Sequence, residues 1–261
     1  MGRHFSVWSA RAAAAVLAMS SACGGSNSSP SGPTAPPLPL AAESADFRFY
    51  YSAGDFVQVE RQEAFHAWAT QRLGVVLPVK IDYRKYTSRT DMGSRTGHYN
   101  TNAYAEPDLF TIHTILPWDH HETVHIYTER IGHPSEFFNE GIAVAFGTDP
   151  LAGDFVPRFN GEALVDSARR YLQNGQLVLP LSRIVATQDF RSISDDVLSY
   201  REAGAFVAFL ITRFGVDPLL QFFRISSRDD SVEVIRQRFA SAFGTTLDAA
   251  EADWLASLRA G

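Results

Sequence analysis

Two histidines four residues apart, separated by a glutamate and two other residues, constrain this 261-residue chain more than any other feature. They lie in the segment His121-Glu122-Thr123-Val124-His125. Residues four apart share one face of an α-helix, so a helix here brings both imidazoles to the same point. Glu122 lies about 100° further around such a helix, beside that face rather than on it. The segment therefore predicts a helix that presents two imidazoles together and a carboxylate next to them.

This pattern is typical of a zinc site. A catalytic zinc ion takes three protein ligands and keeps a fourth position for water, with a nearby carboxylate as general base. The third ligand is expected from the next helix, where Asn139-Glu140-Gly141-Ile142-Ala143 follows a break at Gly132-His133-Pro134. An antiparallel helix pair returns Glu140 towards the histidines, and Gly141 and Ala143 are small enough for the two helices to approach. Glu129 and Glu136 are the alternatives for this ligand.

The H-E-x-x-H segment followed by N-E-G-x-A on the next helix resembles the gluzincin metallopeptidases of the peptidase MA-like superfamily. The short gap between the two motifs is similar to that in small bacterial envelope proteins of this group. The resemblance implies a zincin-like fold with one Zn²⁺ per chain, held by His121, His125 and Glu140. It also implies that Glu122 activates a zinc-bound water to hydrolyse a peptide bond. The partner is then a peptide or protein substrate.

The resemblance covers residues 47–258 and includes the C-terminal half. Its segments there are Leu179-Pro180-Leu181, Phe190, residues 200–207, Phe214-Gly215, Phe243-Gly244 and Trp254. Related gluzincins use a tyrosine or histidine from this half to stabilise the oxyanion, which makes Tyr200 a candidate catalytic residue. The alternative is that Tyr200 packs in the core, since it shares a helical face with Ala203, Val207 and Ile211.

Two other histidines lie near the motif. His120 is on a different face of the helix from His121, so a hydrogen bond and a substrate contact are both open. His113 is on the preceding strand, where it either borders the substrate cleft or is simply half-buried.

The pattern of apolar residues predicts an α+β fold. The expected strands are residues 47–51, 79–83, 109–116 and an edge strand at 99–104. The expected helices are residues 55–73 with a capping box at Asp55 and Gln58, 118–131, 135–146, 164–172, 203–214, one capped by Asp217 before Pro218, 232–243 and 247–258. A mixed N-terminal α/β half with a small sheet thus precedes a helical C-terminal half, and the histidine helix lies between them.

The N-terminus has the features of a secretory signal peptide over residues 1–22, with arginines, an apolar run and then small residues. The segment Ser20-Ser21-Ala22-Cys23-Gly24 resembles a bacterial lipoprotein lipobox, which implies lipidation of Cys23. Two alternatives are a plain signal peptide with an incidental cysteine and N-myristoylation at Gly2. Residues 23–45 are expected to be a flexible linker, and residues 46–261 the zincin-like domain.

Charge and cysteine content limit the other functions. With 23 Lys and Arg against 29 Asp and Glu, the net charge of −6 argues against a nucleic-acid binder. The one cysteine excludes an intrachain disulfide.

Taken together, the motifs and the N-terminal segment predict a zinc peptidase secreted across the inner membrane and lipid-anchored in the bacterial cell envelope. The alternative is a non-catalytic metal- or protein-binding lipoprotein on the same scaffold.

Overall fold

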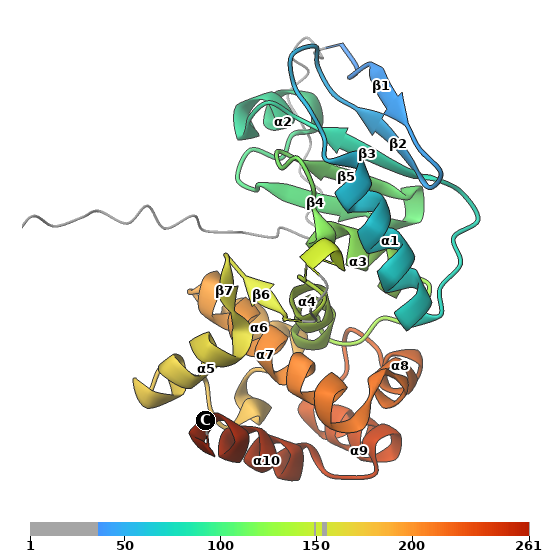
Figure 1. Ribbon diagram of the computed structural model, residues 1–261. Coiled ribbons are helices and arrows are strands. Elements are labelled where there is room, and N and C mark those ends of the chain that lie inside the picture. Colours follow the sequence, from blue (N-terminus) through green and yellow to red (C-terminus); the bar gives the residue numbers. More distant parts are fainter. Residues whose placement is uncertain (1–35, 149, 153–155, 261) are drawn as a thin grey trace, which may run out of the picture.

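The N-terminal half of the chain is built around a five-stranded sheet (Figure 1). In a computed structural model, residues 36–148, 150–152 and 156–260 are described, so the expected signal peptide and Cys23 lie outside the described residues. The strand order is β1-β2-β3-β5-β4. The strands are β1 Leu40–Glu43, β2 Phe47–Tyr50, β3 Ile81–Lys85, β4 Ala103–Glu106 and β5 Thr111–Thr114.

The three inner strands are parallel to one another, and each edge strand is antiparallel to its neighbour. Alternate residues of the inner strands, such as Phe47 and Phe49, are fully buried, as expected when one face of a sheet packs on a core. Edge strand β1 pairs with β2, and Leu38 before it is buried. The linker expected over residues 23–45 overlaps this strand, so the folded part begins before residue 46.

Ten helices are present among the described residues, and most of them form the C-terminal half (Figure 1). They are α1 Val59–Leu73, α2 Arg89–Thr96, α3 His120–Thr128, α4 Glu136–Ala145, α5 Leu164–Gln173, α6 Thr187–Ser192, α7 Asp196–Phe214, α8 Val216–Ile225, α9 Val232–Phe243 and α10 Leu247–Ala260. A short hairpin of β6 Arg158–Phe159 and β7 Glu162–Ala163 lies between α4 and α5 in the chain. The chain is therefore an α+β protein, as the sequence predicts.

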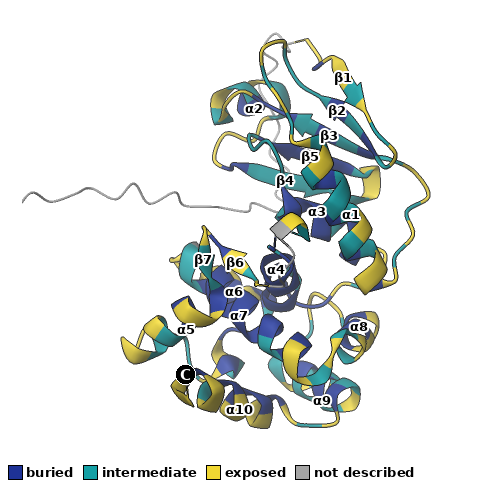
Figure 2. Cartoon of the chain, viewed as in Figure 1, coloured by how far each residue is buried: buried dark blue, intermediate teal, exposed yellow. Residues whose placement is uncertain are grey.

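Helix α4 joins the two halves and is buried along nearly all of its length (Figure 2). It packs against α3 on one side and α7 on the other. A Cβ at Gly141 would lie 2.6 Å from Val207 Cγ2 and 2.9 Å from the carbonyl oxygen of Ala203, both on α7. The small residue at 141 therefore permits a close approach to α7, whereas the sequence suggested α3.

Several expected helix starts are wrong: α7 begins at Asp196 rather than at residue 203, and two further errors concern capping patterns. The capping box at Asp55 and Gln58 does not form: α1 begins at Val59, and the Asp55 carboxylate instead pairs with buried Lys85. Asp217 is inside the first turn of α8, which begins one residue earlier at Val216 after Gly215. At Asp55 the ion pair with Lys85 competes with capping, and at Asp217 the helix has already begun after Gly215. Neither effect can be predicted from a local capping pattern.

No single described helix combines the length and apolar composition that crossing a membrane requires. Helices α7 and α8 together meet this test, but they are bent by 120° to each other.

Candidate metal centre

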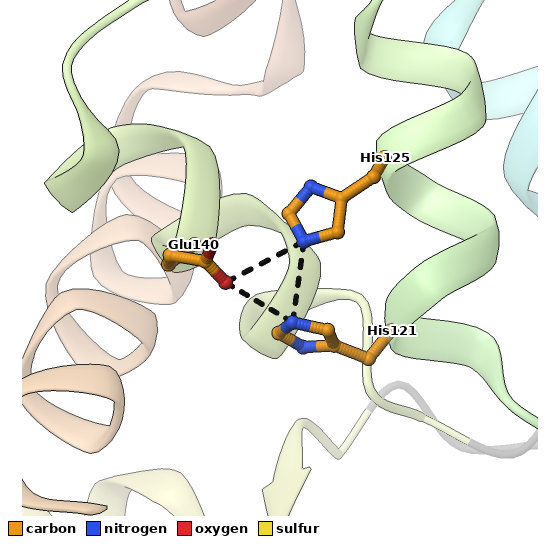
Figure 3. Close-up of side chains that lie close together, drawn as sticks. All are labelled: His121, His125 and Glu140. Carbon is orange, nitrogen blue, oxygen red and sulfur yellow. Dashed lines mark hydrogen bonds and ion pairs between the residues drawn. The ribbon is translucent and has the colours of Figure 1, made fainter. Parts of the chain in front are cut away.

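The side chains of His121, His125 and Glu140 meet between α3 and α4 (Figure 3). Nε2 of His121 lies 3.1 Å from Oε2 of Glu140, and Nε2 of His125 lies 3.4 Å from the same oxygen. The two imidazole nitrogens are 3.3 Å apart. Among the described residues, these three form the group of potential ligands whose donor atoms all lie within 4.8 Å of one another.

The three donor atoms form a nearly regular triangle, and its size fits one metal ion. Ligands about 2.0–2.1 Å from a tetrahedral zinc are separated from each other by roughly 3.3–3.4 Å. The separations of 3.1, 3.3 and 3.4 Å agree with that value. Two imidazoles and one carboxylate are also a common donor set of catalytic zinc sites. The residues present therefore fit a single Zn²⁺ ion.

The start of α3 is fixed by contacts with residues outside the H-E-x-x-H motif. Asp119 is the N-cap: its Oδ1 accepts a hydrogen bond from the Glu122 amide at 3.1 Å, and its Oδ2 accepts one from Thr114 Oγ1 at 2.9 Å. The Asp119 amide in turn donates to Oε1 of Gln62 on α1 at 3.2 Å. In a capping box the glutamate at this position would accept that amide proton. Because Gln62 accepts it, the Glu122 carboxylate is left to line the cavity beside the metal ligands.

Asn139 lies next to the other nitrogen of one ligand. Its side-chain amide nitrogen is 3.4 Å from Nδ1 of His125. With the amide rotated by 180° its oxygen would instead accept the Nδ1 proton of His125, and Nε2 would be left for a metal. The only sequence signal for this role is that Asn139 precedes Glu140 in the second motif.

Burial and neighbouring charges shift the pKa values of the ionisable groups in the centre. Burial lowers the pKa of His125, but the Glu140 carboxylate outweighs burial and raises this pKa to about 9. Burial also raises the pKa of Glu140, yet the two histidines hold it well below its usual range. Mainly because of burial, the pKa of Glu122 is raised to about 7. A divalent cation binds neutral imidazoles and an ionised carboxylate, so it would replace the protons that this arrangement attracts.

Tyr200, near the start of α7, is buried beside the centre. Its ring is nearly parallel to that of His121, at 28°, with the ring centroids 6.0 Å apart. It also packs against Phe190, at a centroid distance of 5.7 Å. The structure thus brings Tyr200 next to a predicted ligand, and both predicted roles, catalysis and packing, remain compatible with this position.

The alternative third ligands have other partners. Glu129 lies 3.5 Å from Nδ1 of His133, and Glu136 pairs with Arg191.

The two other histidines near the motif, His113 and His120, are buried and have partners within the protein. His120 stacks on Phe65 at a centroid distance of 3.9 Å, and its Nδ1 is 2.9 Å from the Thr148 carbonyl oxygen. His113 lies between the Tyr86 hydroxyl and the Glu106 carboxylate, 2.7 and 2.9 Å away.

A cavity of about 350 Å³ adjoins the centre. Glu122, His125 and Glu140 line it on the helix side, and Tyr104 and Ala105 of the edge strand β4 line it on the sheet side. Further lining residues come from the end of α3 and the start of α4, together with Arg228. The candidate metal centre is therefore open to a space the size of a small ligand pocket.

Comparisons with known proteins do not assign the chain to a family. No family model and no curated protein matches the chain. The candidate metal centre is consequently supported by its own side chains alone, and the similarity to gluzincins stays a prediction.

Proposed function

We propose that this chain is a zinc-dependent, gluzincin-type peptidase with a zincin-like fold. The observation that supports this most strongly is the triangle of His121, His125 and Glu140, with the Glu122 carboxylate beside it in the same cavity. When bound there, zinc would polarise a substrate carbonyl and make a water molecule more acidic.

The protein groups around the cavity have separate roles in this proposal. Glu122 accepts a proton from the attacking water and passes it to the leaving amine, as a general base and then a general acid. Asp119 and Gln62 hold the first turn of α3, so they fix where that carboxylate lies. Asn139 orients the His125 ring through its Nδ1.

The edge strand β4 favours an extended peptide as substrate. It pairs with β5 along one edge, and its residues Tyr104 and Ala105 line the cavity. An edge strand offers unpaired backbone N–H and C=O groups, to which an extended peptide can add as a further strand. Such a peptide would lie across the cavity with its backbone close to Glu122.

Two substitutions separate the metal ligand from the general base. Glu140→Gln should lose stoichiometric zinc, measured by metal analysis after gel filtration, because one ligand of three is lost. Glu122→Gln should keep zinc but lose at least about 10²-fold in kcat on a peptide library. Glu129→Gln is the control, because Glu129 lines the cavity without contacting the centre.

The outcomes differ for the two claims. Full zinc binding by Glu140→Gln would show that the ligand assignment is wrong. Zinc binding by the wild-type chain without any chelator-sensitive cleavage would instead favour a non-catalytic metal- or protein-binding protein.

We also propose that the chain is anchored in the bacterial cell envelope through a lipid on Cys23. Labelling with radioactive palmitate should then be lost in Cys23→Ala. Equal labelling of both proteins would exclude this anchor.

A further inference from the structure

Beside the candidate metal centre, one buried carboxylate pairs with two arginines. Oε1 of Glu136 lies 2.8 Å from Nη2 of Arg191 and also contacts Nη2 of Arg228. The Glu136 side chain is 7% exposed, whereas the arginine side chains are 46% and 45% exposed. Two guanidinium groups share one carboxylate, so one positive charge is left in excess at this place.

This charge lies at the cavity of the candidate centre. Glu136 and Arg228 line the same cavity as Glu122 and Glu140. Glu136 precedes Glu140 by four residues of α4, which is about 6 Å along a helix. One residue of an extended peptide spans roughly 3.3–3.6 Å. Because Arg228 contacts Glu136 and lines the cavity, we take its distance from the centre to be of this order, which puts a substrate group one or two residues from the cleaved bond within its reach.

Two hydrogen bonds through Thr187 connect the backbone of Arg228 to the start of α4. The Glu136 amide donates to Thr187 Oγ1 at 3.1 Å, and that hydroxyl donates to the Arg228 carbonyl oxygen at 2.5 Å. The guanidinium of Arg228 has five N–H donors in all, and the contact with Glu136 uses Nη2. The remaining donors of a half-exposed, positioned guanidinium are available to a second anion.

Arg228 is the one arginine among the described residues that line the cavity, and the carboxylates there have other contacts or roles: Glu122 is the proposed general base. Glu140 faces the two imidazoles, and Glu129 is paired with His133. A guanidinium group binds a carboxylate through two parallel hydrogen bonds, which gives it a stronger preference for that group than for a neutral amide.

We propose that Arg228, held by Glu136 and accompanied by Arg191, determines substrate specificity by binding a carboxylate of the substrate one or two residues from the cleaved bond. The carboxylate is either the C-terminus of the peptide or an Asp or Glu side chain. This inference deepens the proposed peptidase function and rests on it for the identity of the ligand as a peptide.

The test compares peptides that differ only in charge. A fluorescently labelled, randomised hexapeptide library is prepared in two forms, with a free C-terminal carboxylate and with a carboxamide. Binding is measured by fluorescence anisotropy on zinc-loaded Glu122→Gln, which should not cleave the peptides. Cleavage is measured by mass spectrometry on the active protein. Asp or Glu enrichment among bound amide peptides distinguishes a side-chain carboxylate from the C-terminus.

We expect the carboxylate form, or the Asp- and Glu-containing amide peptides, to bind about tenfold or more tightly than neutral peptides. In Arg228→Gln this preference should fall to within about twofold, and Arg228→Lys should retain part of it. Arg224→Gln is the matched control, because it removes one exposed positive charge four residues away that does not line the cavity. Arg191 still pairs with Glu136 in Arg228→Gln, so the variant should fold, which its Tm verifies.

The result separates this inference from the peptidase proposal. Cleavage without any carboxylate preference, or with a preference that Arg228→Gln keeps, would overturn the role of Arg228 and leave the peptidase in place. A binding preference that Arg228→Gln abolishes, in a protein that cleaves nothing, would support the role of Arg228 and contradict the peptidase.

Discussion

At the scale of single residues, one substitution distinguishes the two predicted roles of Tyr200, catalysis and packing. Its ring lies beside His121, so its hydroxyl is a candidate for a second oxyanion donor. Tyr200→Phe keeps the ring and its packing and removes only the hydroxyl. A catalytic role predicts a loss of roughly 10²–10³ in kcat with zinc binding and Tm unchanged. Unchanged turnover, measured on the best library substrate, would assign Tyr200 to packing alone.

Glu202 is a buried carboxylate away from the metal centre. It is fully buried on α7, its Oε2 accepts a hydrogen bond from the Val178 amide at 2.9 Å, and its Oε1 has no hydrogen-bond partner among the described residues. Burial, with a smaller contribution from the charge of Glu251, raises the pKa of Glu202 to about 8. The folded chain thus keeps a proton on Glu202 at neutral pH.

This raised pKa predicts a direction for the pH dependence of stability. Between pH 4.5 and about 8 the unfolded chain loses the proton and the folded chain keeps it, so stability falls as pH rises through this window. Glu202→Gln mimics the protonated form and removes this loss. From pH 4.5 to pH 9 the variant should gain on the order of 2–4 kcal/mol relative to wild type. Urea unfolding at several pH values measures this, and a constant difference would contradict a buried proton.

At the scale of helices and strands, the packing of α4 on α7 predicts the effect of substituting Gly141. Alanine is a better helix former than glycine by about 1 kcal/mol, so Gly141→Ala would stabilise an isolated α4. Here its Cβ would lie 2.6 Å from Val207 Cγ2 and 2.9 Å from the Ala203 carbonyl oxygen, so overpacking outweighs propensity. We expect a net loss of about 1–3 kcal/mol by urea unfolding, and weaker zinc binding because Glu140 is the preceding residue.

The double variant Gly141→Ala with Val207→Ala is the control for this clash. It removes the side-chain contact but keeps the Ala203 carbonyl, so it should restore part of the zinc affinity. Wild-type stability and zinc affinity in Gly141→Ala would show that α4 and α7 do not approach so closely.

The elements that the sequence predicts well are those with local signals at both ends. Helix α9 has the expected bounds because Ser231 caps its start and Gly244, at φ 68°, ends it. Helix α2 is missed because only Met92 and Gly93 in it are buried, so no apolar period marks it. Strand β3 begins two residues later than expected, since Val79 is apolar but 51% exposed.

In the candidate metal centre, too, residues within local motifs are predicted and contacts between distant residues are not. Helical spacing within the first motif predicts that His121 and His125 share one face. Glu140 is predicted from the return of the next helix and from the resemblance of the second motif. The contacts of Gln62 with α3 and of Arg228 with Glu136 join residues far apart in the chain. They depend on how the helices pack against one another, and no pattern within a short segment contains that information.

At the scale of the whole molecule, the candidate centre joins the two halves. Helix α3 carries two of the candidate ligands and packs on α1, β4 and β5 of the sheet half. Helix α4 carries the third candidate ligand and packs on α6 and α7 of the helical half. A metal ion held by both helices would therefore link the halves through three short bonds, at the place where Figure 1 shows them meeting.

This position predicts that zinc stabilises both halves together. A ligand that binds only the folded chain adds about 2.7 kcal/mol at 100 times its Kd, which raises Tm by roughly 5–10 °C for a chain of this size. Adding a chelator should reverse this shift in wild type and in Glu129→Gln, and should have no effect in Glu140→Gln. Amide hydrogen exchange should show zinc-dependent protection in α3 and in α4 with the adjoining part of α7. Protection confined to α3 would mean that the histidines bind metal without Glu140, and that the two halves are held together by apolar packing alone.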